Sequence, residues 1–127
     1  MVLDSSVILT FLLNERGRAA AQDAIADCGL ISSVNFAEVM SRLVRDGAEP
    51  DTAADVLLAL PLRVVDLDAS LASEAGRMIA ATRPFGLSLG DRVCLALAKR
   101  ERAPALTADR AWAEAGPLSG VEVRLIR

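Results

Sequence analysis

The sequence predicts an α/β fold in which short strands alternate with helices around a mostly parallel sheet. Short apolar runs recur along the 127 residues, and most are followed by a longer segment with apolar residues at helical spacing. Strands separated by helices form βαβ units, whose parallel sheet is covered by helices on both faces. The length suits one domain, residues 1–127, with a substantial core.

The first half of the chain contains two expected strands and three expected helices. Alanine-rich composition indicates the first of these helices, and a proline at the first helical position opens the third. Strands are expected at Val2–Leu3 and Leu30–Ile31, and helices at Gly17–Cys28, Val34–Asp46 and Pro50–Leu60.

The second half continues the alternation. Ser88 and Asp91 have the spacing of a capping box and open a strong, largely apolar helix, whereas Pro84 and Gly86 indicate a loop before it. The other expected elements are strands at Leu62–Leu67, Ala105–Thr107 and Val121–Ile126, and helices at Asp68–Thr82 and Asp109–Ala115; the loop covers Arg83–Leu87.

The composition excludes several kinds of chemistry. The chain has no histidine, which removes Ser–His and Cys–His pairs and every zinc site that needs a histidine ligand. Acid–base or metal chemistry must therefore use carboxylates. With one Trp, three Phe and no Tyr, a stacking platform for single strands is not expected, and a net charge of −3 alone argues against a nucleic-acid partner.

The cysteines and the N-terminal segment indicate a cytoplasmic protein without a membrane partner. Cys28 and Cys94 are too few for a disulfide framework, so both are expected to be buried free thiols. The apolar run Val7–Leu13 is far shorter than the ~20 residues that span a bilayer, and Asp4 stands where a signal peptide would carry a basic residue.

Four acidic residues are expected near one edge of the sheet, where parallel strands end and ligands bind. Asp4 ends the first strand, Glu38 lies in the helix after the second, and Asp109 follows the strand ending at Thr107. Asp91 lies in the first turn of its helix, on the same face as Cys94, and is expected to point inward. Together they are the candidate site.

Oxygen ligands without histidine or a thiolate cluster suit Mg²⁺ or Mn²⁺, and an acidic pocket of this kind suits phosphoryl chemistry. Acidic residues at such positions can also have a purely structural role, as a helix cap or in a turn. Glu38 has the spacing of a capping-box partner for Asn35, and Asp109 could cap the helix that follows it.

Four segments resemble the signature blocks of the PIN domain and, more narrowly, of VapC-type toxins of bacterial toxin–antitoxin pairs. The segments are Met1–Leu9, Ser32–Val39, Leu87–Ala98 and Ala105–Trp112. The resemblance implies a three-layer α/β/α domain and an endoribonuclease that uses Mg²⁺, or Mn²⁺ in its place, to cut RNA. It also implies a homodimer and a VapB-like antitoxin that inserts a basic residue into the acidic pocket, with higher assembly on operator DNA.

The resemblance assigns roles to particular residues. Asp4, Glu38, Asp91 and Asp109 match the acidic quartet that binds metal and carries catalysis, with Asp4 and Asp91 as the principal ligands. Three polar residues match positions that orient the ligands or water, and two arginines next to site acids are candidates for RNA-phosphate contact or for pairing with carboxylates. These are Ser6, Asn35 and Thr107, and Arg92 and Arg110.

Other polar and aromatic residues receive a structural interpretation. Arg42 and Arg45 are expected on a solvated helix face, Asp66 and Asp68 at a turn and a cap, and Trp112 in the core.

Two alternatives remain open at this point. A phosphoreceiver-type signalling domain would use Asp66 as the acceptor, although the only lysine, Lys99, lies within an expected helix. A PIN-like module without catalysis would bind RNA or a protein partner equally well with and without Mg²⁺.

Overall fold

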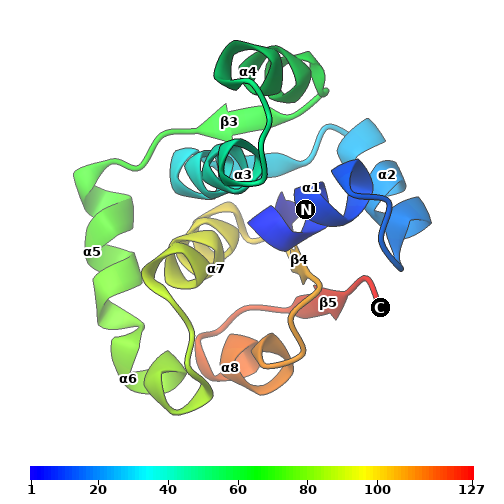
Figure 1. Ribbon diagram of the computed structural model, residues 1–127. Coiled ribbons are helices and arrows are strands. Elements are labelled where there is room, and N and C mark those ends of the chain that lie inside the picture. Colours follow the sequence, from blue (N-terminus) through cyan, green and yellow to red (C-terminus); the bar gives the residue numbers. More distant parts are fainter.

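The computed structural model describes residues 1–127 and has five strands and eight α-helices (Figure 1). The strands are β1 (Val2–Leu3), β2 (Leu30–Ser32), β3 (Arg63–Val65), β4 (Ala105–Thr107) and β5 (Val123–Leu125). The helices are α1 (Ser5–Leu12), α2 (Arg18–Ala26), α3 (Ser33–Arg45), α4 (Pro50–Ala59), α5 (Ala69–Arg77), α6 (Ile79–Thr82), α7 (Leu89–Glu101) and α8 (Trp112–Leu118).

All five strands form one parallel sheet in the order β3-β2-β1-β4-β5, which confirms the predicted α/β class. The chain moves from β1 outward to β2 and β3, then returns to place β4 on the other side of β1. The direction of winding therefore reverses between β1 and β4. In open parallel sheets, ligands bind beyond the carboxyl ends of the strands at such a point.

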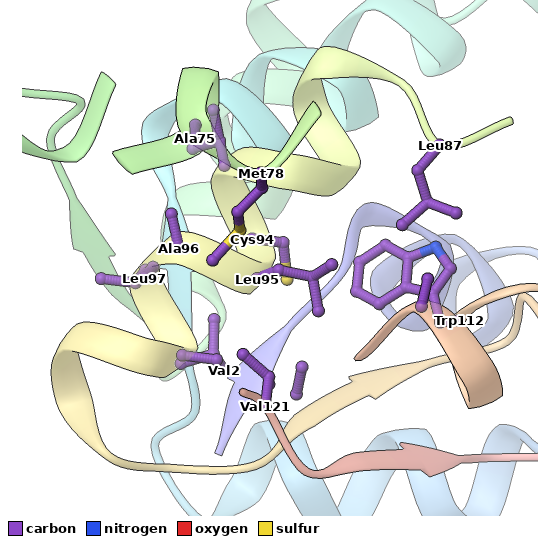
Figure 2. Close-up of a cluster of buried hydrophobic side chains, with 14 of the residues drawn as sticks. Val2, Ala75, Met78, Leu87, Cys94, Leu95, Ala96, Leu97, Trp112 and Val121 are labelled. Carbon is purple, nitrogen blue, oxygen red and sulfur yellow. The ribbon is translucent and has the colours of Figure 1, made fainter. Parts of the chain in front are cut away.

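Helices cover both faces of the sheet, as the expected three-layer arrangement requires. Successive strand residues point to opposite faces, so Val2 packs under α5–α8 and Leu3 packs under α1–α4. Figure 2 shows the first of these two cores, which contains Cys94 and Leu95 of α7 together with Trp112. The buried position of Trp112 confirms its predicted packing role.

The long helix expected over Asp68–Thr82 is broken at Met78, which separates α5 from α6. The carbonyl of Ala75 would accept from Ile79 in an unbroken helix. It accepts a 3.1 Å hydrogen bond from Nη1 of Arg92 on α7. The predicted N-cap at the start of this segment is confirmed, because Asp68 accepts from the backbone N–H of Leu71.

Two segments of the second half differ from the sequence expectation. The expected loop Arg83–Leu87 contains a 3₁₀ turn, Arg83–Phe85, whose proline occupies a first-turn position where it replaces no hydrogen bond. The last helix begins at Trp112 and runs through Pro117, so Asp109 lies before it rather than inside it.

Cys28 is exposed, which contradicts the expectation of two buried thiols. It follows α2 in the left-handed conformation (φ 57°) of a helix-ending turn, and its side chain faces solvent. Cys94 is fully buried, as expected. No helix of the chain combines the length and hydropathy needed to cross a membrane.

Candidate active site

The four acids Asp4, Glu38, Asp91 and Asp109, here called the site acids, come from four segments near the carboxyl edge of the sheet. Asp4 directly follows β1 and Asp109 lies two residues beyond β4, so they flank the point where the winding reverses. Glu38 lies in α3, and Asp91 lies in the first turn of α7. The topology therefore brings together residues that are up to 105 positions apart in the sequence.

Asp4 is buried, with 3 % of its surface exposed, and two hydroxyl groups fix its carboxylate. Ser6 donates to Oδ2 of Asp4 at 2.6 Å and Thr107 donates to the same oxygen at 2.9 Å. Oδ1 accepts only a long contact of 3.4 Å from Ser5. The carboxylate is thus held by one oxygen, and the other is left available for a ligand.

The same hydroxyls also fix the loop that carries Asp109. Ser6 accepts from the backbone N–H of Ala108 at 2.9 Å, and Thr107 accepts from the N–H of Asp109 at 3.1 Å. Both hydroxyls therefore contact Asp4, and their role in orienting metal ligands or water remains a prediction. Removing either hydroxyl would loosen two of the segments that form the site.

Glu38 is half-buried and is held by Asn35, one turn earlier in α3. Nδ2 of Asn35 donates to Oε1 of Glu38 at 2.8 Å and to the carbonyl of Gly90 at 3.2 Å, which links α3 to α7. Ser32 donates to the amide oxygen of Asn35 at 2.6 Å and caps α3 through the N–H of the same residue. The N-cap is therefore Ser32, and the capping-box interpretation of Asn35 and Glu38 is wrong.

Asp91 forms the predicted capping box with Ser88, in which each side chain accepts from the other residue's backbone N–H. Its carboxylate is turned back toward the start of α7 and is only half-buried, so it points inward less than its helix face predicts. Asp109 is exposed, and its Oδ1 accepts from the N–H of Ala111 at 3.0 Å. This contact closes a turn before α8, whose N-cap is Ala111, so the interpretation of Asp109 as the cap of that helix is wrong.

The negative charges of the site acids act on one another. Burial raises the pKa of Asp4 above its ordinary value, although the hydrogen bonds from Ser6 and Thr107 oppose the rise. Burial also raises the pKa of Glu38 and of Asp91, and the charge of Asp4 adds to both. None of the ion pairs in the protein includes a site acid.

This donor set fits a hard divalent cation by its chemistry. Four carboxylates with no cationic partner and no histidine present only oxygen ligands, which suit Mg²⁺ or Mn²⁺. The side chains do not yet form a group of three close enough to hold one ion together. Asp91 and Asp109 each use one carboxylate oxygen to accept from a backbone N–H of their own segment.

Cys94 lies beneath the site and does not extend the donor set. Burial raises the pKa of its thiol well above the ordinary value, and the charges of Asp4, Asp91 and Glu38 raise that pKa further. The group therefore stays a neutral thiol, which is a poor metal ligand.

The arginines predicted to contact phosphate occupy different environments. Arg92 donates to a carbonyl of α5, and its buried Nε has no partner, so its side chain links two helices and does not extend freely into solvent. Arg110 is exposed and forms no ion pair, and its phosphate contact remains a prediction. Arg42 lies on the solvated face of α3, as expected, and pairs with Asp46.

Two residues of the site were not predicted from the sequence. Ser32 orients the amide of Asn35, and its three-residue spacing from Asn35 is the usual signal of an N-cap. Gly90 supplies the carbonyl that Asn35 binds and lies against Glu38. A glycine in the first turn of an otherwise strong helix was the available signal.

Comparison with known proteins agrees with this architecture. The family model described as the PIN domain matches residues 1–117. A search of curated proteins finds no match. Among solved structures, the Mycobacterium tuberculosis toxin VapC20, which cleaves the sarcin–ricin loop, has a TM-score of 0.73 at 19 % identity, over 90 % of this chain and 93 % of that one.

Two further similar structures are complexes with DNA. VapBC from Salmonella typhimurium has a TM-score of 0.72 at 17 % identity, covering 98 % of this chain and 96 % of that one. VapBC2 from Rickettsia felis, bound to a fragment of its promoter, has a TM-score of 0.71 at 15 % identity, covering 97 % and 96 %. At such identities the likeness is one of fold. Since the family model spans most of the sequence, the chain belongs to the PIN domain family.

Proposed function

We propose that this chain is a Mg²⁺- or Mn²⁺-dependent endoribonuclease and the toxin of a toxin–antitoxin pair. One observation carries the proposal: Asp4 is buried at the reversal point of the sheet with no basic side chain paired to it, and burial together with the charge of Asp4 raises the pKa of Glu38 and Asp91. Burying carboxylates that repel one another is unfavourable unless a cation joins them.

The protein's own residues prepare such a site. Ser6 and Thr107 hold Asp4 in one orientation, and Asn35 does the same for Glu38. Asp91 and Asp109 would complete the ligand set by exchanging their partly exposed turn contacts for a ligand. A divalent cation held by the site acids would supply an activated water and neutralise charge on the phosphoryl group under attack.

The reaction we propose is hydrolysis of an RNA phosphodiester. Water attacks phosphorus, the bond to the ribose O3′ breaks, and the products carry a 5′-phosphate and a 3′-hydroxyl. Arg110, exposed next to Asp109, is a candidate for contact with the RNA backbone.

The toxin role rests on family membership together with the similar structures, which include toxin–antitoxin complexes from several bacteria. We infer a VapB-like antitoxin that places a basic side chain among the site acids, where an arginine would pair with carboxylates. We also infer a homodimer and, with the antitoxin, an assembly on operator DNA, since the Salmonella typhimurium complex is bound to DNA and the Rickettsia felis complex to a promoter fragment.

The phosphoreceiver alternative loses its support. The flavodoxin-like order of receiver domains is 2-1-3-4-5, whereas this sheet has the order 3-2-1-4-5. Asp66 follows β3, the edge strand, and β2 separates β3 from the strand that Asp4 follows.

The test is cleavage of a labelled RNA by the purified protein with Mg²⁺, with Mn²⁺ and with a chelator. We expect cleavage only with metal, its loss in Asp4→Asn, and full activity in Asp66→Asn, which changes an exposed acid outside the site. RNA binding that is equal with and without metal, without any cleavage, would instead identify a non-catalytic binding module.

A further inference from the structure

Gly90 is the second residue of α7 and is buried against Glu38 of α3. A Cβ atom at residue 90 would overlap Oε1 of Glu38 and would lie 2.8 Å from its Cδ and 3.1 Å from Oε2. Real Cβ atoms essentially never approach other heavy atoms that closely. The carboxylate of Glu38 therefore occupies space that any other residue at position 90 would fill.

Backbone conformation does not explain this glycine. Gly90 is absent from the residues with positive φ, so an L-residue could adopt its backbone. Glycine is also the least favourable residue in a helix apart from proline, and alanine is the most favourable. What position 90 requires of its residue is the absence of a side chain.

Hydrogen bonds hold the two segments at this short separation. One amide group, Nδ2 of Asn35, donates both to Oε1 of Glu38 and to the carbonyl of Gly90. Ser32 fixes the orientation of that amide by donating to its oxygen. The contact between Glu38 and Gly90 is thus part of a hydrogen-bond network that connects the start of α7 to α3.

We propose that Gly90 is the positioning residue for Glu38: the absent side chain at position 90 admits the Glu38 carboxylate to the acidic site, and a larger residue there displaces it. The expected loss of RNA cleavage rests on the proposed function, whereas the displacement of Glu38 does not. The displaced atoms are the end of a flexible side chain, so a larger residue at position 90 would leave the fold intact and move the Glu38 carboxylate out of the acidic site.

The test uses Gly90→Ala with a matched control, Gly76→Ala. Gly76 lies in α5, also lacks a positive φ, and has no atom within 4 Å of an added Cβ. Both substitutions increase helix propensity, but only the Cβ atom added at position 90 overlaps Glu38. We expect Gly76→Ala to leave RNA cleavage unchanged and Gly90→Ala to lower it about 100-fold, the scale of a small misplacement in a catalytic group.

Thermal unfolding of the metal-free protein tests the steric claim without reference to activity. We expect Gly90→Ala to raise the unfolding midpoint when Glu38 is already alanine, because the clash is gone and the gain in helix propensity remains. In the wild-type and Glu38→Gln backgrounds, where a side chain of full length remains, the same change should raise the midpoint less or lower it. An equal shift in all three backgrounds would overturn the proposal.

The remaining outcomes also decide the question. If Gly90→Ala alone fails to fold and the Glu38→Ala double variant folds, the clash is confirmed; if both fail, the proposal is wrong. Full cleavage activity of Gly90→Ala would overturn the positioning role. An inactive wild-type protein would contradict the proposed function, and the thermal comparison would still decide whether Gly90 makes room for Glu38.

Discussion

Thr107 donates a 2.9 Å hydrogen bond to Oδ2 of Asp4, a residue 103 positions earlier in the chain. The bond joins the ends of β1 and β4, the two strands between which the winding of the sheet reverses. Together with the bond from Ser6, it holds one oxygen of the carboxylate and leaves the other with only a long contact from Ser5.

Thr107→Val should keep the shape of the side chain and remove this bond. Because the hydroxyl lowers the pKa of Asp4, its loss should raise that pKa further and move the acidic limb of the pH–rate profile to higher pH. We expect affinity for the activating metal to fall about 10- to 100-fold. Mn²⁺ titrations of the cleavage rate at several pH values measure both effects.

Thr82→Val is the control, since Thr82 is also buried but donates to the carbonyl of Met78 outside the site. It should leave the metal dependence and the pH profile unchanged. An unaltered metal affinity in Thr107→Val would show that the hydroxyl does not orient Asp4.

The metal-free protein should lose stability as the pH rises above the ordinary pKa values of its carboxylates. Asp4, Glu38 and Asp91 have folded-state pKa values raised above the ordinary 3.8, 4.5 and 3.8, so the folded protein binds their protons more tightly than the unfolded chain does. The stability that these protons confer is complete below the ordinary values and is lost as the pH passes the raised ones.

Surface acids with lowered pKa values oppose this trend only below about pH 6, because above that pH they are ionised in both the folded and the unfolded state. They are Asp46, Glu49, Asp68 and Glu74. Unfolding midpoints against pH provide the measurement, and Mg²⁺ or Mn²⁺ should raise the midpoint near pH 7.5 by binding the folded state. A metal-free midpoint that rises over this range, or one that Asp4→Asn leaves equally steep, would contradict the account.

Arg92 and Arg110 should behave in opposite ways when replaced. Arg92→Met removes the hydrogen bond to Ala75 and should lower the free energy of unfolding by about 1–2 kcal/mol, with RNA affinity unchanged. Arg110→Ala should leave stability unchanged and weaken RNA binding, reducing the salt dependence by about 0.7 in the logarithmic slope. Urea unfolding and RNA binding at several salt concentrations distinguish the two variants. Weaker RNA binding with unchanged stability in Arg92→Met would show that Arg92 contacts phosphate.

The sequence was sufficient to predict the parallel α/β class and the placement of the four acids near one edge of the sheet, because both follow from local patterns. Alternating apolar runs mark Val2–Leu3 and Ala105–Thr107 as strands, and strand ends mark Asp4 and Asp109. The break at Met78 could not be predicted in this way, since the carbonyl at the break is bound by Arg92 from a distant helix. Gly90 was missed for the same reason, because its neighbour Glu38 lies 52 positions away.

The most direct test of the central claim is the end chemistry of RNA cut by the purified protein with Mn²⁺. The account predicts fragments with 5′-phosphate and 3′-hydroxyl ends, and no fragments with a chelator or with Asp91→Asn. The asparagine retains an oxygen that can accept from Ser88, so α7 stays capped while the charge is lost. Cleavage that persists undiminished in chelator, full activity of Asp91→Asn, or 2′,3′-cyclic phosphate ends would contradict it.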